Sequence, residues 1–93
     1  MQNYSVTLYK VFEMKYSDLV TIDPEILNGT PVFKGTRVPV QSLFWHLEQG
    51  ISLDEFLDDF PTVTKQQALD LLEISGKILT SPAFKNLYET AVR

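Results

Sequence analysis

Two basic side chains, Lys34 and Arg37, stand close together in a segment rich in glycine and proline, Asn28 to Val40. Lys34 and the glycine after it separate two short extended runs, Pro31–Phe33 and Thr36–Val38, so the pattern predicts a β-hairpin whose tip region carries both bases. A guanidinium binds a carboxylate or a phosphate through two parallel hydrogen bonds, which makes Arg37 the leading candidate for a functional side chain.

A structural explanation of this segment stays open beside the functional one. The Arg37 guanidinium could instead anchor the hairpin to an acid such as Asp23 or Asp59. Asn28 and Gly29 tolerate the positive φ of a tight turn, and glycines at such turns can be purely structural.

A second group of polar residues begins a predicted helix, where Thr64 and Gln67 match the capping-box pattern. In a helix-turn-helix, the first residues of the second helix face the base edges of DNA, and glutamine is a competent reader of adenine. The predicted DNA contacts are therefore Lys34, Arg37, Thr64, Lys65, Gln66 and Gln67. An ordinary solvated and capped first turn explains the last three residues equally well.

Charge argues against tight DNA binding by a single chain. Twelve acidic residues against eight basic ones give a net charge of −4, whereas free-standing DNA-binding domains usually carry a basic surplus. Asp70 and Glu73 fall on the same outer helix face as Gln66, where their carboxylates repel phosphates. A dimer, or a complex with a basic protein, would multiply the few basic contacts and bind more tightly.

One large aromatic side chain, Trp45, is predicted to lie outside the core of its helix. The core face of that helix has the spacing i, i+3, i+4 and i+7 and consists of Val40, Leu43, Phe44 and Leu47. Trp45 projects roughly 140° from the centre of this face. Tryptophan is enriched at binding hot spots, so we predict that Trp45 and Arg37 contact a partner. Alternatively, one of the aromatic-rich chain ends folds over Trp45.

The sequence offers little for catalysis. His46, the only histidine, is predicted roughly 100° from the centre of the same core face, at its rim or in solvent. The lack of cysteine excludes disulfides and thiolate metal ligands or nucleophiles. The acidic residues of the next helix are Asp54, Glu55, Asp58 and Asp59, and a solvated face explains them better than a metal site does. We expect no enzymatic activity, metal or cofactor.

The length of 93 residues suits one small domain. Extended patterns over residues 4–12 and Val20–Ile22, together with the hairpin, predict a small sheet. The pattern turns helical at Pro39, and Gly50 ends that helix in a left-handed cap. A second helix is predicted over Leu53–Phe60.

A third and longer helix follows Thr64 and stops at Ser81-Pro82, and residues 84–92 could form a short amphipathic helix. The core face predicted for the third helix consists of Ala68, Leu71, Leu72, Ser75, Ile78 and Leu79. The fold class is therefore mainly α with a small β-hairpin, in a trihelical arrangement of the winged-helix or homeodomain-like (helix-turn-helix) type.

Six short groups of residues, spread from Ile22 to Thr64, resemble the motifs of a known family. They are Ile22-Asp-Pro24, Gly29-x-Pro31, Gly35-Thr-Arg37, Pro39-Val40, Gly50-Ile-Ser52 and Asp59-Phe-Pro61 with Val63-Thr64. In this order and spacing they resemble the domain-of-unknown-function 433 family over about Tyr16 to Leu79. The resemblance implies a small helix-turn-helix domain with a preceding hairpin, and an antitoxin that is typically partnered with a toxin similar to the PIN-domain nucleases.

The resemblance divides the chain into an N-terminal extension with a predicted strand at 1–15, the family domain at 16–79, and a C-terminal tail at 80–93. No apolar run approaches the roughly 18 residues of a membrane span, and the N-terminus lacks a signal segment. We therefore expect a cytoplasmic protein without a membrane partner.

The expected partners are a nuclease-like toxin, a second copy of the chain, and operator DNA bound by the dimer or the complex. The alternative function is that of a stand-alone helix-turn-helix transcriptional regulator.

Overall fold

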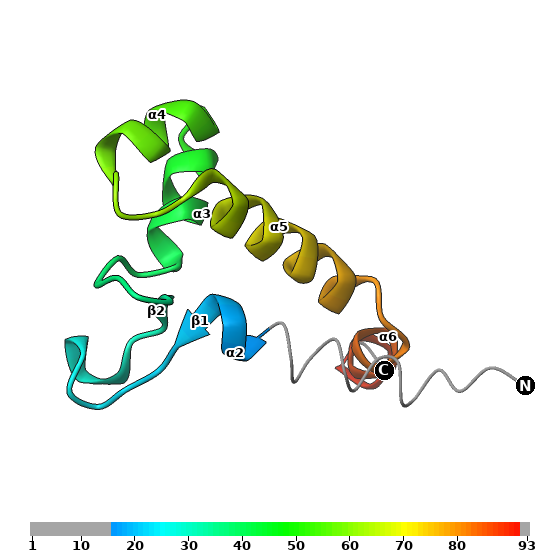
Figure 1. Cartoon of the computed structure of the whole chain (residues 1–93). Helices are drawn as coiled ribbons and strands as arrows, with labels where there is room; N and C mark the ends of the chain where they lie inside the picture. The colour runs from blue at the N-terminus through cyan, green and yellow to red at the C-terminus, as the bar shows by residue number, and fades with distance from the viewer. Residues whose placement is uncertain (1–15, 92–93) are drawn as a thin grey trace, which may run out of the picture.

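A computed structural model describes residues 16–91, and the strand predicted over residues 4–12 lies outside this range. The described part of the chain begins with helix α2 (Tyr16–Leu19), strand β1 (Val20–Thr21), the 3-10 turn η2 (Leu27–Gly29) and strand β2 (Val32–Phe33). Four helices follow, namely α3 (Gln41–Glu48), α4 (Leu53–Asp59), α5 (Lys65–Leu79) and α6 (Pro82–Ala91). Figure 1 shows α5 leading from the unit formed with α3 and α4 to α6 at its far end.

The small sheet pairs β1 with β2 in antiparallel register, with Val20 opposite Phe33 and Thr21 opposite Val32. The second run of the predicted hairpin is not a strand and meets β2 only through a bridge between Val32 and Pro39. Hydrogen bonds from Phe33 N to Val38 O (2.9 Å) and from Val40 N to Pro31 O (3.0 Å) hold this short arm. The run is too short for a longer ladder because Pro39 has no N–H to donate.

The turns around the hairpin have the predicted backbone geometry. Gly35 has a φ of 77° in a four-residue turn that the Thr36 N–H closes by donating to Phe33 O (3.0 Å). Asn28 and Gly29 have positive φ as predicted, and Leu27 joins them with a φ of 47°. Gly35 is therefore a residue at which a side chain would introduce backbone strain.

The caps predicted for the helices are present. After α3, Gly50 has a φ of 79°, and Gly50 N and Ile51 N donate to Leu47 O and His46 O in a Schellman motif. Ser52 begins α4 and Thr64 begins α5, each in a complete capping box. The helix boundaries therefore follow from side chains within a few residues of each end.

One hydrophobic cluster joins the sheet to the three helices α3, α4 and α5. Its buried members are Phe33, Leu43, Phe56, Val63, Ala68 and Leu71. Predicted core residues of α3 and α4, among them Phe44, Leu47 and Leu57, pack against this cluster and are partly buried. The mainly helical class with a small sheet is thus confirmed.

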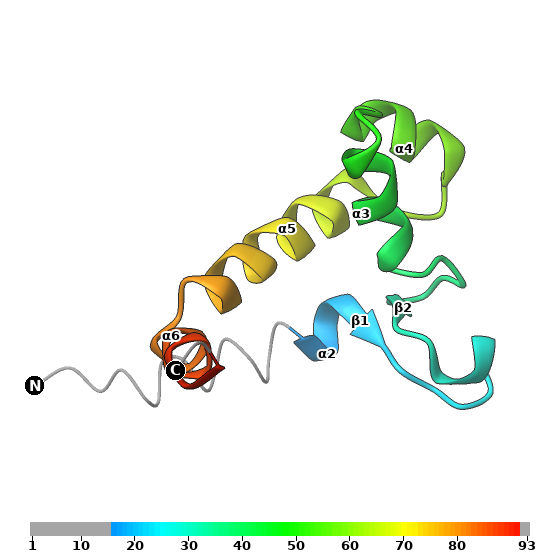
Figure 2. The ribbon, with the colours of Figure 1, turned by 180° about the vertical axis from the view of Figure 1, so that it is seen from behind.

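The core face predicted for α5 is wrong in its second half. Ile74 is 2% exposed, whereas Leu79, which was predicted to be in the core, is 59% exposed. The sequence pattern did not indicate α2, and this helix contacts α5. Packing of α2 therefore helps to decide which face of α5 is buried. Figure 2 shows α2 and β1 running beneath α5 on the side away from α4.

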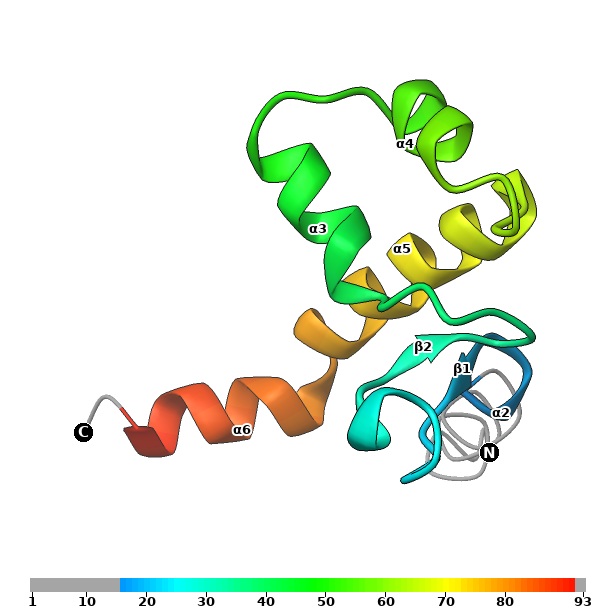
Figure 3. The ribbon, with the colours of Figure 1, turned by 90° about the vertical axis from the view of Figure 1, so that its left-hand side faces the viewer.

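The C-terminal helix α6 begins at Pro82, two residues before the predicted start. Buried Ser81 caps it by accepting a hydrogen bond on Oγ from Phe84 N (3.1 Å). Figure 3 shows α6 extending away from α3 and α4, and none of its residues is buried. Proline therefore starts a helix here, because the first helical position needs no N–H.

We predict that Gly50→Ala lowers the free energy of unfolding by about 1 kcal/mol, because an L side chain is strained at this positive φ. The matched control is Gly76→Ala inside α5, where a Cβ meets nothing within 4 Å. Alanine there should raise stability by about 0.5–1 kcal/mol. Urea unfolding of both variants checks this, and equal shifts of the same sign would contradict it.

Candidate binding site at the hairpin and the start of α5

The two groups of residues predicted to contact DNA, at the hairpin and at the start of α5, lie side by side. The Gln67 side-chain Nε2 donates to the backbone carbonyl of Lys34 at 3.0 Å. On its other side, the Lys34 N–H donates to Leu19 O at 2.9 Å. The hairpin tip is therefore held between the end of α2 and the N-terminus of α5.

The side chains of Gln67 and Thr64 are used in hydrogen bonds within the chain and do not project from the site. Gln67 Oε1 accepts from Thr64 N (2.9 Å), and Thr64 Oγ1 accepts from Gln67 N (3.0 Å). Since Gln67 Nε2 is already bonded to the hairpin, both ends of its amide are occupied. Gln66 donates to Asp70 Oδ1 at 2.8 Å along the outer face of the helix.

Three exposed basic residues, Lys34, Arg37 and Lys65, remain available at this site. Arg37 forms no ion pair with Asp23, Asp59 or any other acid within residues 16–91. Asp23 Oδ1 instead accepts from Glu25 N (2.9 Å), and Asp59 lies 3.8 Å from His46 Nε2. The anchoring role that was left open for Arg37 is thus absent from this part of the chain.

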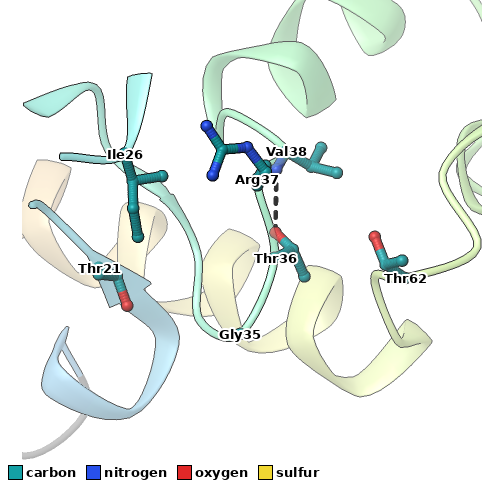
Figure 4. A pocket seen from close by; sticks show the side chains of 7 residues that line it. All are labelled: Thr21, Ile26, Gly35, Thr36, Arg37, Val38 and Thr62. Atoms are coloured by element: carbon teal, nitrogen blue, oxygen red, sulfur yellow. Dashed lines mark hydrogen bonds between the residues drawn. The ribbon is translucent and has the colours of Figure 1, made fainter. Parts of the chain in front are cut away.

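An open pocket of about 560 Å³ lies between the sheet, the hairpin and the loop before α5. Thr21 and Ile26 come from β1 and the segment after it, Gly35 to Val38 from the hairpin, and Thr62 from the loop. Figure 4 shows Thr21 and Ile26 on one side of the opening and Thr36 and Thr62 on the other, with Arg37 extending toward the side of Ile26.

Sequence reasoning found Arg37 but missed the pocket around it. Thr21 and Ile26 are far from Arg37 in the sequence, and neither belongs to a pattern that indicates binding. Thr62 stands two residues before Thr64, where the helix-turn-helix interpretation also offers it to DNA. Only pairing of β1 with β2 and packing of the hairpin on α5 bring these segments together. No local signal in the sequence could have revealed Thr21 and Ile26.

His46 is a packing residue between α3 and α4 rather than a solvated one. Its ring makes edge contacts with Phe56 (5.3 Å between centroids) and Phe60 (5.4 Å), and its side chain is 22% exposed. Its Nδ1 donates to Ser42 O at 2.7 Å. Of the two positions predicted for His46, the rim of the core face is the one observed, because α4 packs beside this part of α3.

Trp45 lies on α3, apart from the residues that line the pocket. It is 55% exposed among the described residues, although its helix is otherwise packed against the core. The expectation that it sits off the core face is confirmed, and none of residues 16–91 folds over it fully.

Metal-binding clusters and membrane-spanning helices are both absent from residues 16–91. Within residues 16–91, no three histidine, cysteine or acidic side chains gather closely enough to hold a metal ion. In the same part of the chain, no helix has both the length and the apolar character needed to cross a membrane.

Comparison with known proteins gives one family match. The sequence profile of the family described as "Protein of unknown function (DUF433)" matches residues 20–73. The matched segment runs from β1 into α5 and contains every residue that lines the pocket.

Two similar proteins extend the comparison. The chain is 38% identical over 50 residues to "Uncharacterized protein y4eO" of Sinorhizobium fredii, a match that covers 54% of this chain and 23% of that protein. The fold resembles the crystal structure of a DUF433 member protein from Anabaena variabilis, with a TM-score of 0.54 and 19% identity. That alignment covers 98% of this chain and 86% of the other.

We predict that Gln67→Ala lowers the free energy of unfolding by about 1 kcal/mol, because it removes half of a capping box and the bond to the hairpin. Gln66→Ala, one residue away and exposed, should change stability by less than about 0.5 kcal/mol. Chemical unfolding of the two variants measures the difference. Equal effects would show that the bond to Lys34 does not stabilise the site.

Proposed function

The chain belongs to the DUF433 family, and we propose that it is an antitoxin-like cytoplasmic protein that neutralises a PIN-like nuclease toxin by direct binding. The partner would be the toxin of a bacterial toxin–antitoxin pair. We further propose that the chain, as a dimer or in complex with the toxin, represses its own operon.

The observation that carries this proposal is the exposure of Trp45 on a rigid helix. A tryptophan that is 55% exposed leaves a large apolar area in water, and such side chains are the commonest anchors of protein interfaces. Because α3 is packed against the core by Leu43, the indole needs little further ordering on binding.

Charge supports a basic partner for the same region. The net charge is −4, and Asp54, Glu55 and Asp58 are exposed on α4, which packs against α3. Complementary charge speeds association and disfavours wrong partners. A toxin with a basic surface would therefore suit this face. A nuclease would provide such a surface, because it binds nucleic acid.

The second candidate is a stand-alone helix-turn-helix regulator of the winged-helix or homeodomain-like type. Its supporting observation is that Lys34, Arg37 and Lys65 lie at one site, because the hairpin is bonded to the start of α5. Against it, the outer face of α5 carries Asp70, and Glu73 pairs with Lys77 at 3.4 Å. A duplex approaching this face would meet carboxylates as well as bases.

We predict that Trp45→Ala weakens toxin binding by about 2 kcal/mol or more while leaving the unfolding transition largely intact. The test co-expresses the chain with a small PIN-like nuclease toxin, and measures growth, complex formation on a sizing column, and affinity by calorimetry. Loss of growth rescue by Trp45→Ala with retained folding supports the proposal.

The control for this test is Leu71→Ala, which removes a side chain that is 5% exposed in the core. It should cost about 2–5 kcal/mol of stability and damage every activity together. If Trp45→Ala unfolds the protein equally badly, Trp45 is a core residue. If the wild-type chain forms no complex and leaves the toxin active, the antitoxin proposal fails.

We also predict that the isolated chain binds duplex DNA weakly, and that the dimer or complex binds more tightly, with affinity falling steeply as salt rises. Lys65→Ala and Gln66→Ala should spare protein association and weaken operator binding, by about 1–3 kcal/mol where a base contact is lost. Fluorescence anisotropy at several salt concentrations measures this. Tight, salt-insensitive binding by a monomer would favour the stand-alone regulator.

A further inference from the structure

The pocket beside Arg37 presents hydrogen-bond donors, and none of its lining residues within the described part of the chain carries a carboxylate. Arg37 contributes a guanidinium that makes no ion pair within residues 16–91. The backbone N–H groups of Gly35 and Arg37 donate no hydrogen bond within the same range. Thr21 and Thr62 add hydroxyl groups at the opposite sides of the opening (Figure 4). A site of this kind attracts an oxyanion.

The rest of the lining is apolar. Ile26 and Val38 contribute aliphatic side chains, and the threonines contribute methyl groups. The pocket is open to solvent and has a volume of about 560 Å³, which leaves room for a side chain of a partner. The ligand that matches both parts of the lining is an oxyanion carried on a short aliphatic chain.

The hairpin holds the backbone on both sides of Arg37 in place. Thr36 Oγ1 donates to Phe33 O (2.8 Å) and accepts from Val38 N (3.0 Å), so its hydroxyl bridges the turn on both sides of Arg37. Phe33 is fully buried beneath this turn, and Gln67 ties the neighbouring carbonyl of Lys34 to α5. A backbone that is already ordered loses little entropy when a ligand binds.

We propose that this pocket binds an aliphatic carboxylate presented by a partner protein, such as a glutamate side chain or a C-terminal residue. The proposal deepens the antitoxin function and rests on it for the identity of the partner, which would be the toxin. Arg37 makes the two-point contact with the carboxylate, while Ile26 and Val38 cover the aliphatic chain.

A phosphate of duplex DNA fits these observations less well than a carboxylate. A duplex brings a row of phosphates together, whereas among residues 16–91 Arg37 is the one basic side chain that lines the pocket. Asp70 and Glu73 on the outer face of α5 oppose further phosphates, and the chain is acidic overall. The aliphatic lining has no counterpart on a phosphodiester backbone.

The carboxylate is tested first without the toxin. Sodium butyrate is titrated into the full-length ¹⁵N-labelled chain, with 1-butanol and inorganic phosphate as comparison probes, and amide shifts are followed by NMR. We expect saturable shifts at Gly35, Arg37 and Thr62 with butyrate in the millimolar range, and weaker effects of butanol and phosphate. Butanol that matches butyrate, or phosphate that binds more tightly, would overturn the proposal, and phosphate would point to a DNA contact instead.

Variants then assign the binding to the pocket. Arg37→Gln should weaken butyrate binding at least about tenfold, whereas Lys34→Gln, the matched base outside the pocket, should change it less than about twofold. Thr62→Phe should block the pocket while retaining the charge of Arg37, which keeps the test valid if Arg37→Gln folds poorly. Unchanged binding in both Arg37→Gln and Thr62→Phe would overturn the proposal.

The toxin complex separates this inference from the proposed function. Arg37→Gln should weaken toxin binding at least about tenfold, as the loss of a charge-assisted contact. If the toxin binds the wild-type chain and Arg37→Gln equally well, the pocket does not hold a toxin carboxylate, although the antitoxin function stands. If butyrate binds as expected and no toxin does, the antitoxin function fails while the carboxylate site stands.

Discussion

Burial of Phe33 is the interaction on which the rest of this structure depends. Its side chain is fully buried, and its ring lies 6.2 Å from that of Phe56, so one residue joins the sheet to the helical cluster. The same residue accepts from Thr36 N and donates to Val38 O, which shapes the turn above it. Removing a buried aromatic side chain typically costs about 3–5 kcal/mol. In this fold it would also release the hairpin that carries Arg37.

The two surfaces that we propose as functional are both supported by the cluster that contains Phe33. The hairpin, tied to α5 by Gln67, forms the wall of a donor-rich pocket. Trp45 projects from α3, whose opposite face is packed against the same cluster, so its indole is left in water. The backbone beneath both surfaces is held by the core and by hydrogen bonds before any partner arrives, which lowers the entropic cost of binding. The family match spans residues 20–73 and therefore includes both the pocket and Trp45.

The sequence predicted best what is decided within a few residues. The capping boxes at Ser52 and Thr64, the left-handed cap at Gly50 and the exposure of Trp45 are all present as predicted. Each follows from a local hydrogen bond, a backbone preference or the period of the helix. The same local reasoning missed α2 and misplaced the core face of α5, because a four-residue helix shows no period and its packing on α5 is remote in sequence.

What the sequence determined by itself is therefore the set of elements and the side chains that each one exposes. Only the tertiary structure decided which of those side chains meet. In the folded chain Gln67 is bonded to the hairpin, and His46 packs between α3 and α4. Thr21, Ile26 and Thr62 lie around the same pocket as Arg37. The physical reason is that packing joins segments far apart in the chain, and such contacts depend on shape and buried area that no short pattern encodes.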